Sequence, residues 1–257
     1  MVRQLAELVE RIKAYNPDVN EDLIVRAYSY AMKKHEKQKR ASGDPFFSHP
    51  IEVAHILTNY RLDTASIVTA LLHDTVEDTS ATVDEISDLF GSEIGRLVDG
   101  VTKLTKIQMQ TIESAQAENF RKLFLAMSED IRVLLVKLVD RLHNMRTLSY
   151  IGSESKRKSI ALETMEIYAP LSDRLGMLEV KTELEDLAFS ELHSEARSSI
   201  VRRLRYLERQ GFDLVGSIMD ELDEVIEDSD IEAYISGRAK TPYSIWRKMQ
   251  IKNVSFE

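Results

Sequence analysis

The 257-residue sequence contains no cysteine, only nine glycines and five prolines, and no long hydrophobic run. Without cysteine there is no disulfide, no thiolate metal ligand and no cysteine nucleophile. No apolar run approaches the roughly 20 residues that a membrane-spanning helix needs, and the N-terminus resembles an amphipathic helix rather than a signal peptide. These absences predict a cytoplasmic protein with no membrane partner.

Basic residues are outnumbered by acidic ones: the sequence has 34 Lys and Arg and 43 Asp and Glu, which gives a formal net charge of −9. A nucleic-acid-binding protein normally carries a basic surface, so we expect no direct nucleic-acid binding. An anionic small substrate is compatible with this charge if local basic residues or a metal ion offset the field of the protein.

The scarcity of Gly and Pro, with many Leu, Ile, Ala, Glu and Lys, predicts an all-α fold for most of the chain. Hydrophobic residues make up 43% and charged residues 30%, which suffices for a sizeable core. We expect helices at 3–14, 20–38, 50–60, 64–76, 82–89, 91–105, 113–127, 131–148, 156–172 and 175–190.

The C-terminal part differs in character. Residues 193–229 predict two long charged helices broken near Gly211, which suit a solvated connector or a partner-binding face. Residues 231–236 alternate apolar and polar side chains, as a half-buried strand does, and Thr241-Pro242 predicts the start of a helix that runs through Met249.

One strand and one helix cannot form a stable core alone, so we expect the chain to stop just inside a second domain. The predicted division is a helical domain at 1–190, a helical linker at 191–230 and a short α/β fragment at 231–257.

The segment 131–148 is apolar almost all round, which is typical of a buried helix. It carries Asp140, His143 and Asn144, and burying these side chains without partners would be costly. A charged helix end with local salt bridges is the alternative explanation.

The segment 65–79 repeats this pattern, because apolar residues surround the helix before His73 and Asp74. Glu77 and Asp78 follow four residues later and would lie on the same side if the helix continues. Such a group repels itself unless a cation or protons occupy it. An acidic helix end in solvent is the weaker alternative, because acids are disfavoured at a helix C-terminus.

His49 precedes Pro50, which predicts an extended conformation just before a helix begins. A lone histidine in this setting is more often structural, and it gains weight only from the other two segments. Together with His73, Asp74 and Asp140 it would form a plausible ligand set for Mn, Fe, Co or Zn.

Three strings, RASGDPFFSHP, LLHDTVEDT and DRLHNMRTL, closely resemble the hydrolase half of the RelA/SpoT homologue enzymes, a branch of the HD-domain superfamily. The resemblance covers most of residues 20–190. It implies an HD-domain helical bundle that hydrolyses the 3′-diphosphate of ppGpp and pppGpp, giving GDP or GTP plus pyrophosphate in the bacterial stringent response. The tail string ISGRAKTPYSIWRKM resembles the start of the family's synthetase domain.

The resemblance also implies roles for individual residues. The metal ligands, usually for manganese, would be His49, His73, Asp74 and Asp140. The acidic pair that orients or deprotonates the attacking water would be Glu77 and Asp78. The guanosine contacts would be Arg40, Ser42, Asn144 and Thr147. Many family members have Arg-Lys where this chain has Arg40-Ala41, which puts the affinity and the preference between ppGpp and pppGpp in doubt.

In the tail, four residues resemble the ATP-binding start of the synthetase domain: Arg238, Lys240, Ser244 and Lys248. The synthetase's catalytic parts would lie beyond Glu257, so we expect no synthetase activity from this fragment. Its partners would be the missing synthetase and C-terminal regulatory domains of a longer protein.

Two other functions are compatible with these residues. One is an HD phosphohydrolase for another nucleotide, such as a dNTP or a cyclic dinucleotide. The other is a regulatory module that binds alarmone and restrains the synthetase domain without hydrolysing it.

Overall fold

A computed structural model of the chain describes residues 2–108, 130–209, 214–227 and 233–255. Within these ranges every regular element is helical, apart from an isolated bridge between Lys39 and Pro45, so the all-α prediction is confirmed there. The helix expected at 113–127 lies outside the described residues. The first helices are α1 (Val2–Lys13), α2 (Glu21–Lys34), α3 (Ser48–Thr58), α4 (Thr64–Leu72), α5 (Thr75–Asp78), α6 (Val83–Phe90), α7 (Ser92–Gln108) and α9 (Ile131–Arg146).

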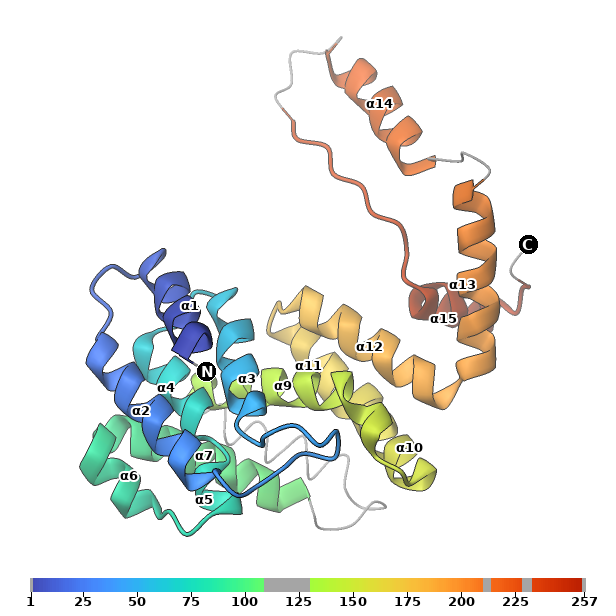
Figure 1. Cartoon of the computed structure of the whole chain (residues 1–257). Coiled ribbons are helices and arrows are strands. Elements are labelled where there is room, and N and C mark those ends of the chain that lie inside the picture. The colour runs from blue at the N-terminus through green and yellow to red at the C-terminus, as the bar shows by residue number, and fades with distance from the viewer. Residues whose placement is uncertain (1, 109–129, 210–213, 228–232, 256–257) are drawn as a thin grey trace.

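The later helices lie on the other side of α9 and in an arm that leads away from the body (Figure 1). A π-helical turn (Thr164–Tyr168) joins the first two of them, where the sequence predicts one continuous helix. These helices are α10 (Glu154–Glu163), α11 (Ala169–Arg174), α12 (Leu178–Leu192), α13 (Ser194–Arg209), α14 (Leu214–Glu227) and α15 (Pro242–Lys252).

Side-chain caps fix where several helices begin. The side chains of Asn20, Asp63, Thr82, Asp130 and Thr241 each accept a hydrogen bond from a backbone N–H two or three residues ahead. The first N–H groups of a helix have no partner within it, so each cap satisfies one of them and sets the start of its helix.

Helices α4 and α9 form the centre of the body. Every residue of α4 from Ser66 to Leu72 is buried, and α9 buries side chains around most of its circumference. Helices α2, α3 and α7 pack around α4, while α3, α7 and α12 pack against α9 (Figure 1). The prediction that 131–148 is a buried helix is therefore confirmed, and its polar residues reach the interior.

The helix expected at 64–76 is interrupted. Helix α4 ends at Leu72, His73 and Asp74 form a turn, and α5 starts at Thr75. His73 Nδ1 lies 2.8 Å from the carbonyl of Ala70, and Thr75 Oγ1 donates to the carbonyl of Leu72 at 2.6 Å. These side chains satisfy carbonyls that the end of α4 leaves open. The break turns the His-Asp pair inward instead of continuing the helix.

The extended conformation predicted for His49 is wrong, because His49 lies in the first turn of α3. Pro50 is the third residue of that helix, where its missing N–H leaves no helical hydrogen bond unmade. The steric preference that proline imposes on the preceding residue is overridden by the packing of α3 against α4 and α9.

The tail departs from prediction in one element. Residues 233–240 form no strand, so the expected α/β fragment is not seen in the part of the tail that the structure describes. A strand needs a neighbour to pair its backbone groups, and the described ranges offer none. The segment instead passes close to α14, where a Cβ on Gly237 would lie 2.8 Å from Val215 Cγ1. Helix α15 starts after Thr241, as predicted, and packs against α12 and α13.

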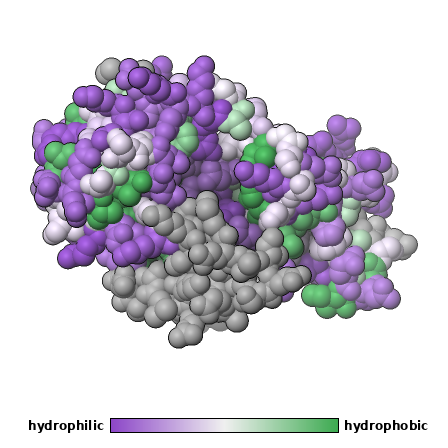
Figure 2. Space-filling model, turned by 90° about the horizontal axis from the view of Figure 1, so that it is seen from below, coloured by the Kyte–Doolittle hydropathy of each residue, from purple (hydrophilic) through white to green (hydrophobic). Residues whose placement is uncertain are grey.

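Among the described helices, none is both long enough and apolar enough to cross a membrane. On the face shown in Figure 2, hydrophilic residues cover most of the described surface, and apolar residues form separate groups.

Candidate metal centre

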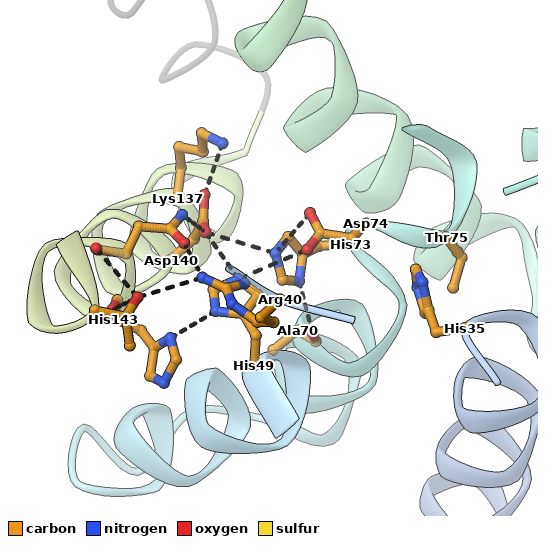
Figure 3. A network of polar contacts seen from close by, with 12 residues as sticks. His35, Arg40, His49, Ala70, His73, Asp74, Thr75, Lys137, Asp140 and His143 are labelled. Carbon is orange, nitrogen blue, oxygen red and sulfur yellow. Dashed lines mark hydrogen bonds and ion pairs between the residues drawn. The ribbon is translucent and has the colours of Figure 1, made fainter. Parts of the chain in front are cut away.

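Three segments that are far apart in the sequence bring polar side chains together at the centre of the body (Figure 3). Helix α3 supplies His49, the turn between α4 and α5 supplies His73 and Asp74, and α9 supplies Asp140. His49 and His73 are each 1% exposed and Asp140 is 4% exposed. One potential ligand atom from each of these three lies within 4.8 Å of the others. They form a buried candidate metal site.

The carboxylate of Asp74 completes the cluster. His49 Nε2 lies 3.0 Å from Asp140 Oδ1 and 3.6 Å from Asp74 Oδ2. His73 Nε2 lies 3.0 Å from Asp74 Oδ1 and 3.7 Å from Asp140 Oδ1. Two ring nitrogens and two carboxylates therefore face one small volume, and this donor set suits a borderline divalent ion.

The hydrogen bonding of His73 supports this interpretation. A carbonyl oxygen only accepts, so the contact with Ala70 places the proton of the neutral ring on Nδ1. The lone pair of Nε2 then faces the two carboxylates, and this buried atom makes no hydrogen bond in the described part of the chain. A lone pair beside two carboxylates needs a positive charge between them, so the residues fit a divalent cation.

The electrostatics of the cluster lead to the same conclusion. Burial would raise the pKa of Asp140, but the charge of Lys137 and the imidazoles hold that pKa well below its usual range. The pKa of Asp74 is lowered to about 2, because His73 and His49 outweigh the effect of burial. Burial alone would lower the pKa of His73, whereas the two carboxylates raise it well above its ordinary value. The ionised carboxylates thus attract positive charge to their centre.

Both oxygens of Asp140 have donors on α9 itself. Lys137 Nζ donates to Oδ2 at 2.7 Å, and Asn144 Nδ2 donates to Oδ1 at 2.6 Å. Lys137 is only 7% exposed, so the pair is buried. These contacts hold the carboxylate in one orientation towards the two histidines.

His143 supports the cluster from the far side of His49. The two Nδ1 atoms lie 2.7 Å apart, so one ring donates to the other. Burial and the charges of His49 and Arg40 lower the pKa of His143 to about 3, which keeps its ring neutral and able to accept. If His49 donates from Nδ1, its Nε2 lone pair is left for a cation.

Neither His143 nor Lys137 is among the site residues expected from the sequence. Their spacing of three residues from Asp140 places all three on one face of α9, and this was the available signal. The partner of His143, however, lies 94 residues away in the sequence.

Arg40 reaches the cluster from the loop after α2. Its Nη2 donates to Asn144 Oδ1 at 2.7 Å and lies 3.4 Å from Thr147 Oγ1. Burial lowers the pKa of Arg40, and the nearby carboxylates oppose this shift. The structure therefore brings three of the four expected guanosine-contacting residues together. The fourth, Ser42, donates to Asp44 Oδ2 within its own loop at 2.8 Å.

The acidic pair lies on α5, directly after the His73-Asp74 turn. Asp78 is exposed and Glu77 is half-buried. Partial desolvation of its carboxyl group and the neighbouring charge of Asp74 raise the pKa of Asp78, which makes its carboxylate a better proton acceptor than an ordinary aspartate.

The tail residues do not join this cluster. Arg238, Lys240 and Lys248 are exposed, and Ser244 lies in the first turn of α15, where its N–H donates to the Thr241 cap. Figure 1 shows α15 against α12 and α13.

A sequence model described as the HD domain matches residues 27–178, which is more than half of the chain. This chain belongs to the HD-domain family. The matched residues include all four members of the cluster.

The relatives confirm the resemblance to the RelA/SpoT family. GTP pyrophosphokinase rsh of Brucella melitensis is 55% identical over the whole of this chain, which covers 34% of that protein. The bifunctional (p)ppGpp synthase/hydrolase SpoT of Escherichia coli K12 is 42% identical over 97% of this chain and 35% of its own length. The HD-domain chain thus spans about a third of the length of these curated relatives.

A solved structure, described as a metazoan ortholog of SpoT that hydrolyzes ppGpp, shares the fold with a TM-score of 0.52 and 25% identity. The match covers 66% of this chain and 94% of the other. That protein is therefore matched over nearly its full length.

Proposed function

We propose that this HD domain hydrolyses the 3′-diphosphate of ppGpp and pppGpp in a manganese-dependent reaction, giving pyrophosphate and GDP or GTP. The observation that carries the proposal is the convergence of two buried histidines, the buried Asp140 and the half-buried Asp74 beside an arginine. A relative named a (p)ppGpp synthase/hydrolase and a solved ppGpp hydrolase of the same fold support the choice of substrate.

In this proposal His49, His73, Asp74 and Asp140 hold the metal. A bound divalent ion would lower the pKa of water and offset charge on the phosphoryl oxygens. Lys137, Asn144 and His143 keep two of these four side chains oriented, because their hydrogen bonds reach Asp140 and His49.

The substrate side is formed by Arg40, Asn144 and Thr147. The half-buried guanidinium supplies the positive charge that an acidic protein otherwise lacks near a nucleotide, and its plane can stack on a purine. Asn144 touches both Arg40 and Asp140, so it connects the nucleotide side of the site with the metal side.

Glu77 and Asp78 orient the attacking water and accept its proton. The water oxygen forms a bond to phosphorus while the bond between phosphorus and the ribose 3′ oxygen breaks. The 3′ oxygen takes a proton and leaves as the hydroxyl of GDP or GTP, and the diphosphate leaves as pyrophosphate.

The test is pyrophosphate release from ppGpp by chelator-treated protein, with and without added Mn²⁺. We expect Asp74→Asn to lower the rate at least about 100-fold. Loss of a hydrogen bond to a metal ligand already costs about 10- to 100-fold in activity, and loss of the ligand itself should cost more. Asp88→Asn, on the exposed surface of α6, is the matched control and should retain wild-type activity.

Folded, metal-loaded protein that releases no pyrophosphate would contradict the proposal. Turnover of a dNTP or a cyclic dinucleotide instead would indicate another HD phosphohydrolase. Tight alarmone binding without turnover would indicate a regulatory module.

We also propose that this chain lacks synthetase activity and acts in the cytoplasm as part of a longer protein. The exposed Arg238, Lys240 and Lys248 would then contact the synthetase domain or its ATP. Incubation with ATP and GDP should give no ppGpp.

A further inference from the structure

Gln38 connects the loop of Arg40 with the helix of the acidic pair. Its side-chain Nε2 donates to the backbone carbonyl of Asp78, the last residue of α5. Its own backbone carbonyl accepts the N–H of Phe46 at 3.1 Å. Gln38 therefore connects the Arg40 loop with α5, because it bonds to Phe46 of that loop and to Asp78, which lies 40 residues further along the chain.

Helix α5 needs such an anchor. It has only four residues, and a single helical turn is not stable by itself. Its N–H and hydroxyl groups make hydrogen bonds close by in the sequence, such as Asp78 N–H to the Asp74 carbonyl at 2.9 Å and Thr79 Oγ1 to the Thr75 carbonyl at 2.6 Å, and the helix packs against α7. The Gln38 contact adds a hydrogen bond from the loop after α2 to the end of α5, 40 residues further along the chain.

His35 in turn holds Gln38. Its Nδ1 lies 2.6 Å from Gln38 Oε1, and an amide oxygen only accepts, so the ring donates from Nδ1. The ring is 2% exposed and stacks on Phe46 with centroids 4.6 Å apart and planes 18° apart. Its other nitrogen, Nε2, is buried without a hydrogen-bond partner in the described part of the chain.

The Arg40 loop shares these contacts. The Arg40 guanidinium lies over the Phe46 ring at 5.7 Å from its centroid, and the Arg40 N–H donates to the Asp44 carbonyl at 2.9 Å. His35 and Arg40 thus both contact Phe46, and Gln38 lies between them in the sequence. A shift of Gln38 would move the acidic pair and the arginine relative to each other.

We propose that Gln38, oriented by His35, is a positioning residue that fixes the position of Glu77 and Asp78 on α5 relative to the Arg40 loop. This inference rests on the proposed hydrolysis. The acidic pair must meet a water beside a phosphate that Arg40 helps to place, and a misplacement of about 1 Å can cost on the order of 100-fold in rate.

The test compares Gln38→Met with Lys34→Met, which changes the last residue of α2, four residues before Gln38. Lys34 pairs with Glu85 on α6 and does not contact the site. For Gln38→Met we expect kcat for ppGpp to fall on the order of 10- to 100-fold, with KM changed less than about threefold. Mn²⁺ affinity should be unchanged, because the four ligands and their hydrogen bonds are untouched. Lys34→Met should keep the wild-type kcat.

His35→Phe keeps a ring against Phe46 but removes the donation to Gln38, and we expect a smaller fall in kcat. A wild-type kcat in Gln38→Met would overturn the inference. So would a parallel loss of Mn²⁺ affinity and thermal stability, which would indicate a general structural role.

Hydrogen exchange separates this inference from the proposed function. If the wild-type protein does not hydrolyse ppGpp, the proposed function fails. The positioning role of Gln38 is then tested separately by the rate of hydrogen exchange at the Asp78 amide. Faster exchange there in Gln38→Met than in Lys34→Met supports the anchor, and equal exchange overturns it.

Discussion

His143 offers the sharpest test of the metal centre, because it touches a proposed ligand without being one. Its Nδ1 lies 2.7 Å from His49 Nδ1. If His49 is the donor of this hydrogen bond, His143→Leu removes its acceptor and leaves the His49 N–H without this partner. We expect weaker Mn²⁺ binding, because the ring of His49 is no longer fixed with its Nε2 towards the carboxylates.

Two independent estimates agree on the size of the effect. Loss of an outer-shell partner typically weakens metal binding about 10- to 100-fold, which corresponds to roughly 1.4–2.7 kcal/mol. A buried donor left without its acceptor costs about 1–3 kcal/mol. We therefore expect the Kd for Mn²⁺ to rise about 10- to 100-fold.

The assay is calorimetric titration of chelator-treated protein with Mn²⁺, with circular dichroism to confirm the fold. His143→Gln is the matched variant, because its amide oxygen can accept the His49 N–H, and its Kd should stay within about threefold of wild type. An unchanged Kd in folded His143→Leu would refute a role for hydrogen-bond donation from His49 Nδ1 to His143 in metal binding. Equal losses in both variants would show that the hydrogen bond is not what matters.

Three further changes follow from the contacts in the structure. Asp140→Asn should abolish Mn²⁺ binding in titration and lower the free energy of unfolding by about 3–5 kcal/mol, because it leaves the buried Lys137 charge unpaired. Adding Lys137→Met should restore stability in urea melts but not metal binding. Arg40→Ala should raise KM for ppGpp about 10- to 100-fold, the effect of losing a charged hydrogen bond, and an unchanged KM would remove Arg40 from the substrate site.

Arg132→Met should lower the free energy of unfolding by about 1 kcal/mol at pH 7 after allowance for solvent screening. Arg132 lies 2.7 Å from Asp63 and helps hold its pKa below the usual value, although burial acts in the opposite direction. A carboxyl group with a lowered pKa stabilises the fold above its unfolded pKa, and this contribution is lost as the pH falls through its folded pKa. The difference between variant and wild type should therefore shrink below about pH 4, and a constant difference would contradict this reasoning.

Much of the site could be predicted from the sequence because it depends on local pattern. The apolar periodicity of 131–148 predicts a buried helix, and a buried helix must give Asp140 partners. The resemblance of three short strings brought His49, His73, Asp74 and Asp140 into one hypothesis, and the fold places them in contact. Lys137 and His143 lie three residues before and after Asp140 on α9, and neither of them was assigned a role from the sequence.

The sequence by itself determined the all-α class and the elements that carry the polar residues, because periodicity and capping act over a few residues. Only the tertiary structure decided which polar residues meet. The His49–His143 and Gln38–Asp78 contacts join elements whose positions depend on packing around α4 and α9. The same reason explains the errors. The turn at His73-Asp74 exists because carbonyls at the end of α4 find side-chain partners, and residues 233–240 form no strand because the described chain provides no neighbouring strand.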